Sequence, residues 1–593
     1  MSSDDNADVT MSSDASTPET PPRPPYCLVH IADFAAGDRL AQLTPVDCDN
    51  FSDVLRQARP EVAVALKPPL GDGSDWEFRL TFDSMASFMP AGLLAQIPAA
   101  KTRLDFWQKL RERRQGRIDE AALTAAIEAA IQADGSLAWL HAAPSAPGAA
   151  PAAPADGSIL DLVDAPDESR RVSADVERLA ADTEQGSARI GGGEAGRLNA
   201  WQQRLTLELT TIANAVLQHP DVRRIETAWR GLKLLVDRID FREGVKLSVL
   251  SAPDDELATR LNEGVIEPAF AGDIPTPGMI LCDRAYENTP MDLALLDELG
   301  RAAASLPAPL VFPMSVAFFG VKSARLLKNL PNLSGLIDGW QFAKWRSLRE
   351  QPHARWLVGV AGRFLLRGLH AATPDAQTFT CAEQVSAASQ LAWAGGHLAM
   401  GVAAARAFAR HGWPTRMFGA EAGKLDDLPI VPNPADAQHP WGPGDMVLPD
   451  RRVDELPAIG LNLLQSMPGK DFCLLLGGMT VARPMPTAEI GAQQAALEVS
   501  LSYQQFSSAV GAWLCEQVPT LRGLDGEEVQ RRLLFGLRDL VGLKEDDAED
   551  ALLVGVGPAP DDPGRTLVQV RITPPGRIVP GGLHVDFGFP LSS

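Results

Sequence analysis

The sequence lacks the short motifs that mark most enzymes and metal-binding proteins. Its nine histidines and six cysteines form no C-x-x-C, H-x-H or H-E-x-x-H pattern, so no metal site is indicated. No G-x-S-x-G elbow and no G-x-x-x-x-G-K-S/T loop occurs, which removes two common signatures of hydrolases and of nucleotide binding. The glycine-rich stretch 191–196 ends a polar region, and we interpret it as a hinge. We therefore expect no catalytic residue, no metal and no cofactor.

Long apolar runs and an excess of positive charge are also absent. The longest apolar stretch, 391–405, contains His397 and is shorter than the ~18–20 residues that cross a bilayer. We interpret it as a buried helix in which His397 is a hydrogen-bonded core residue, and we expect no membrane insertion. The formal net charge of -22 makes nucleic acid and anionic lipid poor partners. The scattered cysteines and a polar start without the features of a secretory signal predict a cytoplasmic protein.

Composition divides the chain into parts of different character. We expect a disordered tail over 1–25, a small folded unit over 26–141, an Ala/Pro-rich and polar linker over 142–197 and a large folded unit over 198–593. The linker prediction depends on residues 142–156, where 8 alanines and 4 prolines among 15 residues cannot build a core. A chain of 593 residues is too long for one compact core, which agrees with two folded units.

Periodicity predicts the elements of the two units. In the small unit, strand-like runs at 26–31, 62–66 and 76–82 precede helical sequence, and Asp119 is the expected N-cap of the last helix. In the large unit, apolar residues follow helical spacing over 205–236, with a break at Pro220. Strand-like and helical segments then alternate to about residue 418. This alternation predicts an α/β or α+β body built in layers.

The chain closes with amphipathic helical sequence and three strand-like stretches. The strands are expected at 552–556, 567–573 and 583–589. The last stretch alternates apolar residues with polar or small ones, which is the period of a strand with one buried face. Its apolar residues are Leu583, Val585, Phe587 and Phe589. A hairpin with the stretch at 567–573 would bury that face inside one domain.

One signature in the large unit resembles a known family. The sequence Ile-Glu-Thr-Ala-Trp-Arg-Gly-Leu at 225–232 is similar to the large contractile-sheath subunit of type VI secretion, TssC. Glu226 and Arg230 lie four residues apart on the predicted helix and can pair. Arg-Phe-Leu-Leu-Arg at 363–367 and Phe-Ala-Arg-His-Gly-Trp at 408–413 follow in the order of that family. The resemblance implies structural roles for Glu226, Trp229, Arg230, Gly231, Arg363, Arg367, Gly412 and Trp413.

The small unit resembles the small sheath subunit, TssB. Asp-Asn-Phe at 49–51, Arg-Pro at 59–60 and Leu-Thr-Phe-Asp-Ser-Met-Ala-Ser-Phe-Met-Pro at 80–90 carry this second resemblance. The chain is therefore similar to a fusion of both subunits. The resemblance implies a small N-terminal sheath domain and a large mixed α/β domain that ends in strands for inter-subunit strand exchange. Leu583, Val585, Phe587 and Phe589 are then the residues expected to join neighbouring subunits.

The resemblance also implies a function and partners. Sheath subunits form helical homo-oligomers around an inner tube on a baseplate, and contraction drives the tube outward without an active site. An apolar island of the linker resembles the segment that the Clp-family recycling ATPase, ClpV, recognises. The island consists of Ile159, Leu160, Leu162 and Val163. The alternative for this island is a patch that packs on its own body.

Two other interpretations stay open. Gly368-Leu-His370 stands where the family has Pro-Tyr-Gly, and Ala422-Gly423 stands where it has Gly-Gly. A polar tail also replaces the extension that usually precedes the first strand. These departures favour a sheath-derived scaffold or baseplate-like adaptor that assembles but does not contract. Only the size and the layered pattern favour a cryptic α/β enzyme.

Overall fold

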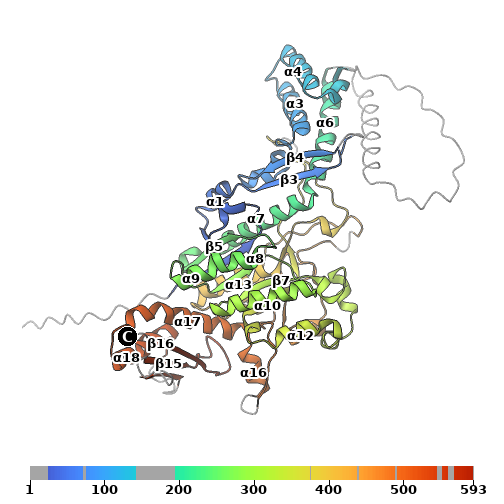
Figure 1. Ribbon diagram of the computed structural model, residues 1–593. Coiled ribbons are helices and arrows are strands. Elements are labelled where there is room, and N and C mark those ends of the chain that lie inside the picture. The colour runs from blue at the N-terminus through green and yellow to red at the C-terminus, as the bar shows by residue number, and fades with distance from the viewer. Residues whose placement is uncertain are drawn as a thin grey trace, which may run out of the picture.

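The structure is a computed structural model that describes residues 24–70, 75–141, 194–373, 376–436, 440–487, 491–543, 551–558 and 566–591. The expected tail over 1–25 and linker over 142–197 lie almost wholly outside the described residues. The described chain is elongated, with a helical end, a central body built on a sheet and a C-terminal unit at the opposite end (Figure 1). The mixed α/β class predicted from the sequence is confirmed.

A nine-stranded sheet forms the body. In spatial order its strands are β11 (Lys424–Leu425), β13 (Cys473–Leu476), β12 (Leu461–Ser466), β8 (Leu357–Ala361), β7 (Leu310–Met314), β6 (Met279–Cys282), β1 (Tyr26–Ala32), β5 (Val245–Ser251) and β2 (Thr44–Val46). Neighbours from β12 to β5 are parallel, whereas β2, β13 and β11 add antiparallel edges. The central strands have continuous apolar sequence because both faces of a parallel sheet are buried.

Strand β1 comes from the small unit but lies inside the sheet of the large one. All of its residues are buried, and it runs parallel to β5 and β6. Leu28 is in register with Leu247 on one side and with Met279 on the other. The predicted strand at 26–31 is confirmed. Its neighbours could not be predicted, because they come from sequence more than 200 residues away.

Helices cover both faces of the sheet and create two cores. On one face, α7 (Pro220–Arg238) and α13 (Gly396–His411) pack on side chains such as Leu28 and Leu281. On the other face, α8 (Leu257–Leu261), α10 (Pro290–Ser305) and α12 (Ala343–Arg349) pack on side chains such as Val29 and Ile280. The first core also contains most of the buried apolar residues of the small unit. The two units therefore share one hydrophobic interior.

The helical end joins residues from both sides of the linker. It contains α3 (Pro98–Arg114), α4 (Glu120–Ala133) and α6 (Glu194–Leu217), and the hairpin of β3 (Glu61–Leu66) and β4 (Trp76–Thr81) lies below it (Figure 1). Arg103 of α3 donates to Glu208 of α6 at 2.9 Å and also pairs with Asp134. Asp119 caps α4 as predicted, since its side chain accepts from the Ala122 N–H at 2.8 Å.

The C-terminal unit has a core of its own. Helices α16 (Ala492–Glu498), α17 (Leu501–Leu521) and α18 (Gly526–Val541) precede an antiparallel sheet in the order β14 (Leu552–Pro558), β15 (Thr566–Ile572) and β16 (Val585–Leu591). The three predicted strands are confirmed, and the last begins at Val585, so that Leu583 precedes it.

Several shorter α-helices and strands occur besides these, together with short 3-10 turns. These helices and strands are α1 (Phe51–Ala58), α2 (Pro90–Leu94), α9 (Glu267–Ala271), α11 (Leu333–Ile337), α14 (Gly419–Ala422), α15 (Asp450–Ala458), β9 (Arg363–Leu365) and β10 (Trp393–Gly395). The last two pair with each other beside the main sheet. Within the described ranges, no helix combines the length and the apolar character that a membrane span needs.

Candidate functional site

Two motifs that lie far apart in the sequence meet in a buried ion-pair cluster. Glu226 of α7 is 1% exposed, and its carboxylate accepts from Arg230 Nε at 2.7 Å. Arg367, just after β9, donates to the same carboxylate from Nε at 2.7 Å and from Nη2 at 3.2 Å. Burial by itself raises the pKa of Glu226, but the two guanidiniums outweigh it and hold that pKa below its ordinary value. Glu226 is therefore a charged group held inside the protein by its partners.

Glu383 completes this arrangement, although the sequence did not single it out. Arg367 Nη1 donates to Glu383 Oε2 at 2.5 Å, and the main-chain N–H of His370 donates to the same oxygen at 3.0 Å. We name Glu226, Arg230, Arg367 and Glu383 the Glu226 cluster. Its two carboxylates balance its two guanidiniums. Glu383 lies in irregular sequence with no periodic pattern, so no local signal could have found it.

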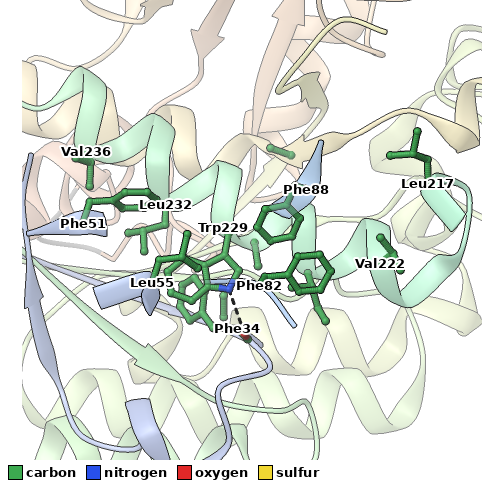
Figure 2. Close-up of a cluster of buried hydrophobic side chains, with 14 of the residues drawn as sticks. Phe34, Phe51, Leu55, Phe82, Phe88, Leu217, Val222, Trp229, Leu232 and Val236 are labelled. Carbon is green, nitrogen blue, oxygen red and sulfur yellow. Dashed lines mark hydrogen bonds between the residues drawn. The ribbon is translucent and has the colours of Figure 1, made fainter. Parts of the chain in front are cut away.

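Trp229 attaches the small unit to the motif helix α7. Its side chain is fully buried, and Nε1 donates to the Phe34 carbonyl oxygen at 3.1 Å (dashed in Figure 2). The centroid of its ring lies 5.1 Å from that of Phe34 and 6.2 Å from that of Phe51. Figure 2 shows Phe82 and Phe88, also from the small unit, in the same cluster. The motif tryptophan thus packs against aromatic residues of the small unit.

The remaining residues of these motifs have packing roles. A Cβ on Gly231 would lie 2.8 Å from Leu398 Cδ1, so the missing side chain lets α7 approach α13 closely. Gly412 ends α13 with φ +69, a left-handed conformation that favours glycine. Trp413 is buried, and its ring centroid lies 5.3 Å from that of Phe506 in α17. Trp413 therefore connects the body to the C-terminal unit.

Arg363 does not join the Glu226 cluster. Its Nε donates to Asp445 Oδ2 at 2.8 Å, and its main-chain N–H donates to Oδ1 at 2.8 Å. Its guanidinium carbon also lies 5.3 Å from the centroid of the Trp393 ring. Arg363 is exposed at the start of β9, whereas Arg367 lies beyond the strand and turns inward. The two arginines of this motif therefore have different partners.

The residues of the predicted terminal strand face the core of their own unit. Val585 is buried, and Leu583, Phe587 and Phe589 are partly buried against the same core. β16 pairs with β15 over its whole length, which confirms the hairpin expected from the sequence. These four side chains are already packed, so the main-chain edge of β16 is the part that remains for another strand.

The two edges of this C-terminal sheet differ. β14 lies against α18, where Gln530 Nε2 donates to the Val554 carbonyl oxygen at 2.7 Å. No main-chain hydrogen bond from another element reaches the outer edge of β16 within the described residues. Pro590 in β16 has no N–H, and proline inside a sheet belongs on an edge strand with its nitrogen turned outward. Gly588, two residues earlier, shares that orientation.

Across the described ranges, no group of three or more His, Cys, Asp and Glu side chains is placed to hold a metal ion.

His397 is fully buried, but neither ring nitrogen makes a hydrogen bond to a described residue. The prediction that it is a hydrogen-bonded core residue was therefore wrong about the hydrogen bond. Its Nε2 lies 3.4 Å from the Asp283 carboxylate. The island of Ile159, Leu160, Leu162 and Val163 lies outside the described residues.

Two family models match the chain. The model described as "Type VI secretion system, VipA, VC_A0107 or Hcp2" matches residues 25–144. The model VipB, described as "EvpB/VC_A0108, tail sheath N-terminal domain", matches residues 201–482. Together these matches span more than half of the chain. The chain belongs to the sheath families of type VI secretion. It carries a VipA unit and a VipB unit in one polypeptide, which confirms the fusion predicted from the sequence.

One curated relative agrees with this assignment. The type VI secretion system sheath protein TssC1 of Pseudomonas aeruginosa is 30% identical over 301 residues, which are 47% of this chain. The chain spans 60% of the length of that relative. The cryo-EM structure of the helical sheath of the anti-feeding prophage in its contracted state has a TM-score of 0.32 at 11% identity, over 58% of this chain and 77% of that chain. The assignment to the sheath families comes from the sequence matches.

Proposed function

We propose that this chain is a structural subunit of a type VI secretion contractile sheath, in which one polypeptide supplies both the small and the large subunit. On this proposal it is a cytoplasmic protein without enzymatic activity. It assembles into a helical tube around an inner tube on a baseplate, and contraction propels the inner tube. Recognition of the island at Ile159, Leu160, Leu162 and Val163 by a Clp-family recycling ATPase belongs to the same proposal.

The position of β1 is the observation that supports this proposal most strongly. The VipA unit contributes an internal strand to the sheet of the VipB unit, and Trp229 of the VipB unit is buried among phenylalanines of the VipA unit. A shared core of this kind is typical of parts that act as one rigid subunit. The fusion also fixes the two units at one-to-one stoichiometry.

The outer edge of β16 supports the assembly step. An open strand edge offers main-chain N–H and C=O groups to a strand from another subunit. A head-to-tail contact of this type that does not close on itself gives a helical filament. The inward residues Val585, Phe587 and Phe589 hold β16 on its own core while the edge is used.

A proline at Gly588 tests the role of this edge. A Cβ at Gly588 meets no atom within 4 Å, so alanine fits, and Pro590 shows that this strand accommodates proline. Gly588→Pro removes an outward N–H and leaves the pairing with β15 intact, whereas the matched control Gly588→Ala keeps the N–H. We expect Gly588→Pro to fold with an unchanged urea midpoint but to stay in the supernatant when polymers are sedimented. We expect Gly588→Ala to sediment like the wild type.

Two outcomes distinguish the alternatives. Sedimentation of folded Gly588→Pro at the wild-type level would contradict assembly through the β16 edge. Small closed oligomers in place of long polymers, from the wild type as well as from Gly588→Ala, would favour the non-contractile scaffold that the sequence departures at Gly368-Leu-His370 left open.

A further inference from the structure

A pocket of about 160 Å³ lies on the face of the body opposite α7, where α11, α12 and the turn before β12 meet. Three arginines line it, Arg346, Arg349 and Arg483, together with Asp338. A cavity needs only ~10–15 Å³ of water-accessible space to hold one water. The pocket is smaller than the pockets of ~300 Å³ or more that hold drug-sized ligands. The pocket therefore has room for a small ion and its water.

Arg349 is the buried wall of this pocket. It is 8% exposed, its Nε donates to the Val481 carbonyl oxygen at 3.0 Å, and its Nη2 donates to the Ala458 carbonyl oxygen at 3.1 Å. Its Nη1 makes no hydrogen bond to a described residue, and within the described ranges no carboxylate lies within 4 Å of its guanidinium. Nη1 is not among the buried atoms that lack a partner, so it is open to the pocket and offers a donor there with the positive charge of the guanidinium.

The other charged groups around the pocket do not neutralise Arg349. Arg346 Nη1 donates to the carbonyl oxygens of Ile337 and Gly339, which are neutral. Arg483 lies at the exposed mouth, 3.5 Å from Glu350. Burial, followed by the positive charge of Arg483, lowers the pKa of Arg349 to about 10. Three guanidiniums thus face Asp338 and Glu350, and the site keeps a net positive charge on a chain whose net charge is -22.

We propose that the Arg349 pocket binds a small inorganic oxyanion of the phosphate class. Guanidinium groups present several N–H donors in a fixed plane and are the preferred partners of phosphate oxygens. Arg349 Nη1 would donate from the buried side, and Arg483 would close the site from the solvent side. The bound ion would connect α12 to the segment after β13, which carries Arg483, and so stabilise this face of the body.

Calorimetric titration of the full chain with sodium phosphate, at ionic strength held constant with sodium chloride, tests this proposal. Arg349→Ala would leave two buried carbonyl oxygens without a donor, so the primary variant is Arg483→Ala, whose side chain is 60% exposed. The matched control is Arg451→Ala, an arginine that is 78% exposed, pairs with Glu455 and does not line the pocket. It removes the same charge from the same protein.

We expect saturable phosphate binding by the wild type and by Arg451→Ala, and binding at least about tenfold weaker by Arg483→Ala, as loss of a charge-assisted hydrogen bond implies. The absence of saturable binding by the wild type would overturn the proposal. Equal weakening by Arg451→Ala and Arg483→Ala would also overturn it, because it would reveal a general effect of net charge. Unchanged phosphate binding by Arg483→Ala would likewise overturn the proposal.

Discussion

Replacement of Glu226 by glutamine perturbs the ion-pair cluster that joins the two sequence motifs. Glutamine keeps the size of the side chain but removes the charge that faces Arg230 and Arg367. Removal of one partner from a buried ion pair costs about 3–5 kcal/mol. The Arg230 and Arg367 side chains are 18% and 12% exposed, and Arg367 keeps Glu383, so we expect a loss near the lower value, about 3 kcal/mol.

Glu528→Gln is the matched control for this measurement. Glu528 also contacts two arginines, Arg531 and Arg532, but their side chains are 76% and 51% exposed. Solvent screens such pairs, so the control should unfold at nearly the wild-type urea concentration. Urea unfolding followed by tryptophan fluorescence and circular dichroism measures all three proteins. Equal midpoints for Glu226→Gln and Glu528→Gln would refute the structural importance of the cluster.

Two further predictions concern buried residues of the shared core. Burial lowers the pKa of His30 to about 4 in the folded protein, so the unfolded chain binds a proton at His30 more tightly than the folded protein does. As the pH falls from ~6.5 to about 4, the free energy of unfolding should therefore decrease by up to about 3 kcal/mol because of His30. The difference in urea midpoint between wild type and His30→Gln measures this effect together with the influence of His30 on His397, whose pKa is lowered by burial and then by the charge of His30. Asp283, whose pKa burial raises to about 6, acts in the opposite direction in both proteins. A difference that stays constant with pH would contradict the prediction. Gly231→Leu should destabilise the protein by about 1–3 kcal/mol, because the new side chain must fit beside Leu398 between two packed helices. The matched control is Gly555→Leu, which should leave the stability nearly unchanged because a Cβ at Gly555 meets open space. Similar urea midpoints for the two variants would argue against close packing at Gly231.

The sequence was sufficient for the elements whose patterns are local. Alternation predicted β4, helical spacing predicted α6 and α7, and Asp119 was a correct N-cap. The pairing of the C-terminal strands also followed from the sequence, because β15 and β16 are adjacent in the chain and form an antiparallel hairpin.

Long-range partners could not be predicted in the same way. Nothing in the sequence of β1 indicates that it lies between β5 and β6, since any buried parallel strand has a similar apolar pattern. Glu383 and the pocket arginines Arg349 and Arg483 could not be singled out from the sequence, because the charged groups around them come together only in the folded chain. The family resemblance singled out Glu226, Trp229 and Arg367, but it did not indicate that Trp229 packs on the small unit.

The most direct test of the account is electron microscopy of the purified full chain under conditions that favour polymerisation. The account predicts long helical tubes in which each repeating subunit contains one VipA unit and one VipB unit, with β1 inside the VipB sheet. Tubes that exclude the VipA unit, or a protein that stays monomeric at every concentration, would contradict the claim that this chain is a single fused sheath subunit.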